Sequence, residues 1–327
     1  MRQFKEVFLV LLTAFMPSCA TTPEVAGPDT AVAMSVRSLV PDAKAVLSAS
    51  LKDAGSSART HAVEVAITTG QTALMPDILK LLEDRSVPVR FTAVIATGEM
   101  MCHGCLGQAK KALQDEDENV RIAAAYSLAR LGQTGHIPLI REAAGSADAT
   151  VRSNALLLLG KLGDKNDLKL LYRAMRDSNA ADKVRLQALE SIARLGDQKI
   201  YRDKLWPLLI SKYADDRVTG IRAMGALGSA EAKTAILTML SDEVPEVRLA
   251  AAEQLGRLND RSGLDEVLAY LQSGPDLNQG TVSNGMAIMA IGYIGSERLD
   301  GYLAKALASS SKYIQLAAAQ SILLRVK

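Results

Sequence analysis

The chain of 327 residues has few aromatic side chains, few histidines and almost no net charge. Aromatic residues make up 4% of it, and no run alternates Val, Ile or Thr with polar residues as the strands of a sandwich do. The 38 basic and 36 acidic side chains leave a net charge of +2, so no global field draws the protein onto nucleic acid or an anionic membrane. These absences exclude an all-β fold and a nucleic-acid partner recognised by overall charge, and any recognition by charge must be local.

A repeated pattern occupies most of the chain. Its clearest form is VRIAAAYSLARLG at residues 120–132, and clear copies start at Val151, Val184 and Val247. Looser copies start at five further positions, namely Ala58, Val89, Asp216, Ser283 and Ile314. Successive copies start 31 to 36 residues apart, and most of these intervals are 31 residues. A fixed period in this range predicts a solenoid, in which each repeat packs on its neighbours.

Each repeat offers two helices, an A helix and then a B helix that carries the pattern. We number the first residue of each copy as position 0. On a helix, positions 0, 1, 4 and 8 share one arc, which is predicted to be buried, and positions 3, 6 and 10 lie opposite. Position 4 is small, position 8 is mostly large and apolar, and position 12 is usually Gly, as a left-handed helix C-cap requires. The predicted fold is all-α, a right-handed α-solenoid of about nine two-helix repeats.

A two-helix repeat near 31 residues, with Asp a few positions before Val-Arg, resembles the HEAT repeats of the short type named after phycobilisome lyases. The resemblance runs from about Ala58 to the C-terminus. Lyases of this family act on bilin chromophores, and other members are di-iron hydroxylases with paired His-Glu motifs. Only His61, His103 and His136 exist here, none is followed by Glu, and nothing marks a bilin site. The protein is therefore predicted not to be an enzyme, with no catalytic residue and no cofactor.

An Arg stands at position 1 of seven repeats, and Asp residues precede several B helices. The Arg residues are Arg59, Arg90, Arg121, Arg152, Arg185, Arg217 and Arg248, and the Asp residues are Asp84, Asp115, Asp148, Asp182 and Asp242. Because position 1 lies in the buried arc near the helix start, we expect each Arg to bridge to an Asp of its own or an adjacent turn. The predicted role is a structural ladder between repeats, with anion binding as the alternative. Asn284 and Gln315 replace the Arg in the last two repeats, which indicates a capping end or a divergent partner surface.

The N-terminus is typical of an export signal. Basic Arg2 and Lys5 precede an apolar run at residues 7–16 that is too short to span a bilayer. The following segment, Met-Pro-Ser-Cys, resembles a bacterial lipobox, which implies cleavage before Cys19 and acylation of that residue. We therefore expect a signal peptide at residues 1–18, a flexible tether at 19–39 and the solenoid at 40–327. The residue after Cys19 is not Asp, and lipoprotein sorting then implies the outer membrane, with the protein facing the periplasm.

A cysteine pair, Cys102 and Cys105, lies in the turn after the second B helix. In an oxidising compartment we expect a local disulfide. A haem attachment needs His after the second Cys, where Leu106 stands, and His103 is at best a third zinc ligand, so no metal site is predicted. A redox or metal role at this turn remains the alternative function, together with an accessory lyase-like activity.

Positions 6 and 10 of the B helices suggest a partner-binding surface on the concave face of the solenoid. Arg130, Lys161, Arg194 and Arg257 stand at position 10, and Tyr126 and Leu157 stand at position 6 beside the first two cations. A second group towards the C-terminus consists of Met286, Met289 and Tyr293. Cations near helix C-termini can also merely complement the helix dipole, and the second group can be buried by the last repeat. The predicted function is a membrane-anchored scaffold in the cell envelope that binds a protein partner of unknown identity.

Overall fold

The computed structural model describes residues 35–327, so the predicted signal peptide and the predicted lipidation site Cys19 lie outside the described part. The described residues belong to one compact unit, Met34–Lys327. They form helices, with no strand among them. None of these helices has both the length and the apolar character that crossing a membrane requires. The predicted all-α class is confirmed for this part of the chain.

The helices alternate between A and B types, as predicted, and make nine two-helix repeats within residues 35–327. The B helices are α2 (Ser56–Thr69), α4 (Val87–Glu99), α6 (Glu118–Arg130), α8 (Ala149–Leu162), α10 (Asp182–Arg194), α12 (Ala214–Leu227), α14 (Pro245–Arg257), α16 (Val282–Ile294) and α18 (Lys312–Arg325). The A helices are α1 (Val40–Ser50), α3 (Met75–Lys80), α5 (Leu106–Ala112), α7 (Ile137–Ala143), α9 (Leu168–Arg176), α11 (Trp206–Leu209), α13 (Ala230–Thr238), α15 (Leu264–Gln272) and α17 (Gly301–Leu307).

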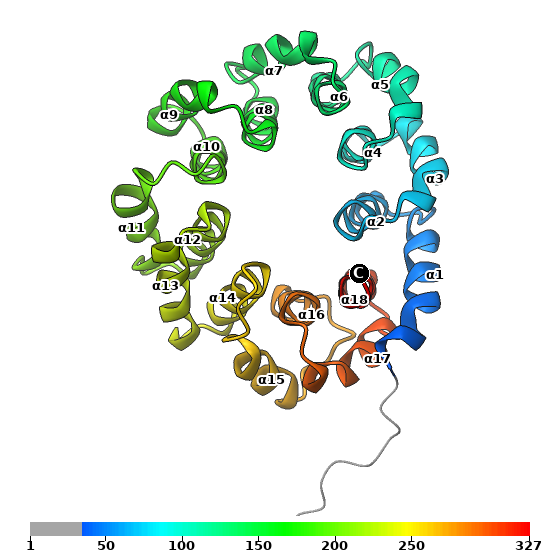
Figure 1. Ribbon diagram of the computed structural model, residues 1–327, viewed down its shortest axis with the longest axis vertical. Coiled ribbons are helices and arrows are strands. Elements are labelled where there is room, and N and C mark those ends of the chain that lie inside the picture. Colours follow the sequence, from blue (N-terminus) through cyan, green and yellow to red (C-terminus); the bar gives the residue numbers. More distant parts are fainter. Residues whose placement is uncertain (1–34) are drawn as a thin grey trace, which may run out of the picture. The chain divides into compact units, whose positions relative to one another are not determined.

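The nine repeats of this unit follow one another round a ring (Figure 1). The B helices form its inner layer and the A helices its outer layer. The last helix, α18, packs against α16 on one side and against α1 and α2 of the first repeat on the other. The closure buries apolar surface at both ends of the array, since Leu47 of α1 and Ile322 of α18 are both fully buried. The expectation of a capping end at the last repeats is therefore wrong, because the first repeat covers them.

The ordered body starts slightly before the predicted boundary at residue 40. A 3-10 helix spans Val36–Leu39, and both of these residues are buried in the core. This 3-10 helix also contacts α18. Residues 36–39 are thus part of the ring rather than of the tether, because two apolar side chains find a buried place against the last helix.

The B-helix pattern predicts the local structure well. The glycines at position 12 all adopt positive φ and end their helices, namely Gly70, Gly132, Gly163, Gly196, Gly228 and Gly295. Three repeats place another residue there. Met101 (φ 52°) and Asn259 (φ 57°) take the same left-handed conformation, whereas Val326 of the last repeat does not (φ −112°). A left-handed conformation is costly for a residue with a Cβ, so the helix ending is set by the repeat geometry and not by Gly alone.

Close approach between neighbouring B helices depends on position 9, which the sequence reading did not single out. A Cβ added to Gly98 would lie 2.6 Å from the Cα of Ser127, and one added to Gly160 would lie 2.7 Å from the Cβ of Ser191. The Ser127 hydroxyl donates to the Val94 carbonyl at 2.7 Å, and the Ser191 hydroxyl donates to the Leu156 carbonyl at 2.9 Å. Glycine facing serine therefore lets α4 and α6, and likewise α8 and α10, pack in backbone contact.

Candidate functional site on the inner face of the ring

The Arg residues at position 1 form a ladder wherever an Asp follows 25 residues later. Arg59 donates two hydrogen bonds of 2.8 Å to the carboxylate of Asp84, which precedes the next B helix. The other pairs of this kind are Arg90 with Asp115 (3.0 Å), Arg152 with Asp177 (2.9 Å) and Arg217 with Asp242 (2.8 Å). In Asp84, burial raises the pKa, but the hydrogen bond from Arg59 and the Ser86 backbone N–H outweigh it, so the pKa lies below the usual value. These ion pairs of the ladder link successive repeats.

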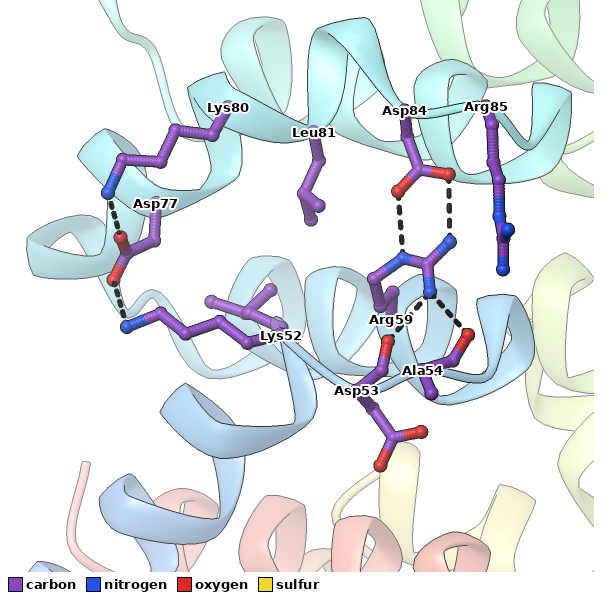
Figure 2. A pocket seen from close by; sticks show the side chains of 10 residues that line it. Lys52, Asp53, Ala54, Arg59, Asp77, Lys80, Leu81, Asp84 and Arg85 are labelled. Atoms are coloured by element: carbon purple, nitrogen blue, oxygen red, sulfur yellow. Dashed lines mark hydrogen bonds and ion pairs between the residues drawn. The ribbon is translucent and has the colours of Figure 1, made fainter.

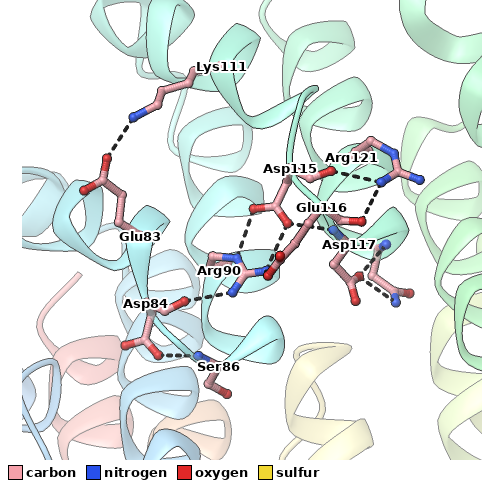
Figure 3. A network of polar contacts seen from close by, with 10 residues as sticks. Glu83, Asp84, Ser86, Arg90, Lys111, Asp115, Glu116, Asp117 and Arg121 are labelled. Atoms are coloured by element: carbon pink, nitrogen blue, oxygen red, sulfur yellow. Dashed lines mark hydrogen bonds and ion pairs between the residues drawn. The ribbon is translucent and has the colours of Figure 1, made fainter.

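Three of the seven Arg residues depart from the ladder, because Ser146, Ile210 and Ser273 stand where the Asp is needed. Arg121 donates to the backbone carbonyls of Asp115 and Glu116 in its own repeat (Figure 3). Arg185 pairs with Asp182 one turn away in the same helix. Arg248 instead bridges to Glu266 of α15 at 2.7 Å. The prediction of an Asp partner is therefore wrong for Arg121, whereas Arg185 has an Asp partner in its own turn, as expected, but adds no link between repeats.

The remaining polar residues of the predicted ladder act within their own repeats. Asp148 caps α8 by accepting from the backbone N–H groups of Thr150 and Val151. Gln315 donates to the Ser309 carbonyl six residues earlier, which is the same contact that Arg90 makes with the Asp84 carbonyl. Asn284 likewise donates to the Asp276 and Gln279 carbonyls. Asn284 and Gln315 thus close a turn as the Arg residues do, and are no separate partner surface.

A pocket of about 490 Å³ lies beside the first ladder pair, and its lining includes Arg59, Asp84 and Lys52. Figure 2 shows the Arg59 guanidinium held between the Asp84 carboxylate and the carbonyls of Asp53 and Ala54. These contacts use four of the five N–H groups of the guanidinium. An anion in this pocket would have to compete with a carboxylate already in place, so the geometry supports the structural role over anion binding.

The inner face of α4, α6 and α8 carries a closed polar network around Glu99. Tyr126 is fully buried and donates its hydroxyl to Glu99 at 2.7 Å. The Lys161 ammonium lies 2.6 Å from the same carboxylate, and an Arg130 nitrogen lies 3.8 Å from it. Burial raises the pKa of Glu99, but the hydrogen bond and charge of Lys161, with Tyr126 and Arg130, bring the pKa below its usual value. Burial and the neighbouring Glu99 raise the pKa of Tyr126.

The expectation that Tyr126 is exposed beside a basic rim is wrong, and the curvature of the ring is the reason. Lys161 belongs to α8 and Glu99 to α4, so the two side chains meet across the intervening α6. On the concave side of a tightly curved layer, side chains of alternate helices converge and cover the residue between them. Tyr126 therefore belongs to the core, and Leu157 is half-buried.

The other cations of the predicted surface are also paired. Arg194 bonds to Glu190 at 2.8 Å, and Arg257 bonds to the buried Glu253 at 2.8 Å, each within one helix. Arg257 also stacks over the ring of Tyr293, with 4.1 Å from the guanidinium carbon to the ring centroid.

In the second predicted group, Met286 is buried, and Met289 and Tyr293 are half-buried. Gln320 of α18 donates to the Tyr293 hydroxyl at 3.4 Å. The last repeat covers most of this group, so the structure favours the alternative reading of burial.

One exposed residue of the inner face is not among the predicted site residues. Arg222 stands at position 6 of α12, is exposed, and has no ion pair or hydrogen bond within residues 35–327. The charges of Glu253 and Arg222 both act on Tyr313 of α18, whose pKa is raised mainly by burial. A lone Arg without a carboxylate at i±3 or i±4 in its helix was a signal that the sequence already contained.

The cysteine pair lies away from these residues, at the turn between α4 and α5. Cys102 and Cys105 form a disulfide, with their Cα atoms 5.3 Å apart. Cys105 is buried, whereas Cys102 is half-buried and His103 is exposed. Among residues 35–327, no group of three or more His, Cys, Asp or Glu side chains is arranged to hold a metal ion.

The comparison with protein families decides the classification. Residues 108–193 and 202–279, about half of the chain, match the model of HEAT repeats. The chain belongs to the HEAT-repeat family. The search of curated proteins gives no match.

Several solved structures are similar to this HEAT-repeat chain. The complex of CpcE and CpcF of phycocyanin lyase from Nostoc sp. PCC7120 is 18% identical, with 79% of this chain and 99% of that chain covered and a TM-score of 0.45. Human deoxyhypusine hydroxylase in complex with glycerol is 17% identical, with 80% and 98% covered and a TM-score of 0.40. Importin beta is 14% identical, with 86% and 46% covered and a TM-score of 0.35.

Proposed function

We propose that this protein is a non-enzymatic scaffold that holds a carboxylate-bearing segment of a protein partner on the inner face of the ring. The observation that carries the proposal is the set of exposed Arg side chains on three successive B helices. Arg194 of α10, Arg222 of α12 and Arg257 of α14 are all exposed, whereas the inner face of α4 to α8 is covered by its own network. We call the inner face of α10, α12 and α14 the open arc.

The open arc suits carboxylates for a physical reason. A guanidinium offers a planar fork of donors that matches a carboxylate, and Arg222 has no such partner within residues 35–327. Arg194 and Arg257 are held in place by Glu190 and Glu253, so little side-chain entropy is lost when a ligand contacts them. Closure of the ring fixes the spacing of the helices in advance. The function is rigid presentation of a surface, without chemistry.

The test is site-specific crosslinking in intact cells. A photoreactive residue at position 222 should yield one crosslinked protein, and mass spectrometry should map the link to a segment rich in Asp and Glu. Arg222→Glu should then reduce capture about tenfold or more, because it replaces a favourable charge contact by a repulsive one. Lys305→Glu on the outer α17 is the control with the same charge change, and should leave capture unchanged. Two results would refute the proposal that the open arc binds the partner. One is crosslinking from position 222 to many unrelated proteins, and the other is undiminished capture by Arg222→Glu.

The second candidate function is thiol–disulfide exchange at Cys102 and Cys105. The observation in its favour is that the bond lies in a turn with one half-buried cysteine and an exposed His103 beside it. Reduction would break the S–S bond with two electrons and two protons and leave two thiols. A potential near those of disulfide oxidoreductases would support this role, and a potential below about −300 mV would indicate a structural bond.

The proposed location is the bacterial cell envelope, and the support comes from the sequence alone. Export and lipidation are proposed from the apolar run at residues 7–16 and the segment that ends at Cys19. In this proposal the lipid anchors the protein in the outer membrane, and the protein faces the periplasm. Cys19→Ser should then release the protein from the membrane fraction, because acyl chains contribute about 0.8 kcal/mol per buried CH₂. Finding the protein with native Cys19 in the soluble fraction would overturn the anchor.

A further inference from the structure

The outer layer of the ring exposes a group of large apolar side chains around α11. Trp206 is 41% exposed, Ile210 67% and Tyr213 60%. They follow one another at intervals of four and three residues, while Leu205 and Leu209 point into the core and are buried. Within residues 35–327 these three make up half of the exposed large hydrophobic residues. Apolar side chains gathered in this way on an outer surface indicate a contact site.

Local structure explains why α11 presents these residues. The A helix of this repeat changes from a π-helical turn at Tyr201–Leu205 to the short α11, which follows it without a gap and has Pro207 as its second residue. Pro207 has no backbone N–H, so it cannot donate the hydrogen bond of a regular α-helix at this point. The ring of Trp206 packs beside that of Tyr201, with centroids 6.4 Å apart. This π-helical turn is the only one within residues 35–327.

Unpaired cations surround these apolar residues. The preceding outer helix α9 carries exposed Lys169, Arg173 and Arg176, and its residues include no acid. The segment of α11 adds exposed Lys199, Arg202, Lys204 and Lys212. None of these seven forms an ion pair within residues 35–327, although the whole chain has a net charge of only +2. These seven cations come from α9 and from the segment of α11, and α9 and α11 follow one another in the outer layer (Figure 1).

The two helices form one continuous surface. The Tyr172 hydroxyl of α9 donates to Asp197, in the turn that leads to the π-helical turn, at 3.0 Å. Arg176 lies over the Tyr172 ring at 5.0 Å. A recess of about 710 Å³ beside α9 is lined by Lys169, Tyr172, Arg173 and Arg176, with Arg152 and Asp177 already paired to each other at its edge. We call this combined surface, α9 with residues 199–213, the outer patch.

We propose that the outer patch docks on an anionic lipid bilayer, with Trp206, Ile210 and Tyr213 at the level of the headgroups and the seven cations against lipid phosphates. Trp and Tyr favour this level because each has an apolar body and a polar group, and Lys and Arg extend apolar stems while their charges stay at the surface. Anionic lipids attract such cations within a Debye length. Three large apolar side chains, two of them aromatic, stand exposed beside the cations on the outer layer, and this combination favours a bilayer over a protein segment.

This inference goes beyond the proposed scaffold function and does not depend on it. The outer patch lies on A helices, whereas the open arc lies on the inner B helices. Docking by the outer patch would therefore leave the open arc accessible. It would also be separate from any anchor at Cys19, because the side chains that carry it are all within the described part of the chain.

The experiment uses Trp206, which is the only Trp of the chain, as an intrinsic fluorescent probe. The full chain is titrated with vesicles of equal parts phosphatidylglycerol and phosphatidylcholine. The Trp206 emission should shift to shorter wavelength, and lipids brominated near the headgroup should quench it. Pure phosphatidylcholine vesicles should give neither effect. Attachment through residues near the N-terminus would not bring Trp206 into the bilayer, so this readout reports the outer patch itself.

Two sets of variants make the test specific. Lys169→Glu, Arg173→Glu and Arg176→Glu together should weaken binding to the anionic vesicles roughly 100-fold, since each cation near the surface contributes about fivefold. Lys110→Glu, Lys305→Glu and Lys312→Glu make the same change in net charge at exposed, unpaired sites on other helices, and should weaken binding far less. Ile210→Ser should reduce quenching by the brominated lipids without changing charge.

Three results would overturn the proposal. The first is an unchanged Trp206 spectrum with anionic vesicles, and the second is an equal loss of binding in both triple variants. The third is a shift of the spectrum that requires a purified protein or a nucleic acid instead of lipid. Far-UV circular dichroism of each variant verifies that the helices are retained.

Discussion

The inner stripe, namely positions 6 and 10 of the B helices, and the outer patch both carry cations. Within residues 35–327, four cations of the inner stripe have a carboxylate partner and Arg222 has none, whereas none of the seven in the outer patch has one. Arg130 and Lys161 share Glu99, Arg194 has Glu190, and Arg257 has Glu253. The seven cations of the outer patch have no carboxylate within ion-pair distance in the described part of the chain. A row of basic residues is therefore not by itself evidence of a binding surface, and the presence or absence of internal partners distinguishes the two rows.

The partners also decide what each row contributes. A cation that pairs with Glu stabilises the fold, either between helices, as Lys161 does with Glu99, or within one helix, as Arg194 does with Glu190, so its removal should weaken the fold. An unpaired cation that stands close to other cations adds repulsion, so its removal should do the opposite. The following predictions test this difference, beginning with the largest effect.

Tyr126→Ala should destabilise the protein by about 3 to 5 kcal/mol, because it leaves a cavity where a fully buried aromatic ring stood and removes a partner of Glu99. Tyr126→Phe, which keeps the ring, should cost about 1 to 2 kcal/mol for the lost hydrogen bond. Trp206→Ala in the outer patch should change stability by less than about 1 kcal/mol. Urea unfolding followed by circular dichroism measures all three. A small effect of Tyr126→Ala would mean that the inner stripe is solvent-exposed after all.

Arg217→Ala should destabilise by about 3 kcal/mol, because it leaves Asp242 buried without its partner. Arg121→Ala is the matched control, since it stands at the same position of its helix but pairs with no carboxylate. The control should cost clearly less in the same unfolding experiment. Equal losses would show that position 1 matters for packing or for its carbonyl contacts, and that pairing across repeats adds nothing.

Glu99→Gln should remove part of the acid sensitivity of the fold. The pKa of Glu99 is lower in the folded state than its usual value of 4.5, which applies to the unfolded chain. The charged carboxylate therefore stabilises the fold at any pH above 4.5. This stabilisation is lost as the pH falls through the pKa of the folded state. The variant should be less stable than wild type by about 1 to 2 kcal/mol at neutral pH, and the gap should narrow below pH about 4. Unfolding curves at pH 7 and in acid measure the gap. A constant gap would mean that Glu99 is not charged in the folded state.

The repeats and their local geometry could be predicted from the sequence, because they depend on neighbours along the chain. Helix faces, the left-handed glycines and four ladder pairs follow from spacings within or between adjacent copies. The ladder could have been predicted fully from one further rule, namely an Asp 25 residues after the Arg. Close helix approach at Gly98 and Gly160 is also encoded in the sequence, by a Gly at position 9 of these two repeats.

The candidate site was harder to predict because it depends on curvature. Periodicity gives the face of each helix, but not whether Lys161 reaches Glu99 across α6. Closure of the ring is also a property of summed small rotations between repeats, and no single repeat encodes it. Predicting the outer patch requires no knowledge of the curvature. An A helix without acid at residues 168–176 and a Pro inside the next A helix are both visible in the sequence.

Lys169→Glu should stabilise the protein by about 0.5 to 1 kcal/mol, which is a small effect and the one with the opposite sign. Lys169 is the second residue of α9, where the helix dipole disfavours a cation, and it stands four residues before Arg173. Glu at this place would favour the dipole and form an i, i+4 pair with Arg173. Arg194→Gln in the inner stripe should instead lose about 0.3 to 0.5 kcal/mol, because it breaks the pair with Glu190.

Thermal unfolding at low salt measures both changes, and added salt should shrink them, since both are interactions between exposed charges. A destabilised Lys169→Glu would show that the outer cations do support the fold, and the distinction between the two rows would fail. A stabilised variant that also binds anionic vesicles more weakly would mean that Lys169 lowers stability while it serves binding. Stability alone would then not account for the basic character of α9.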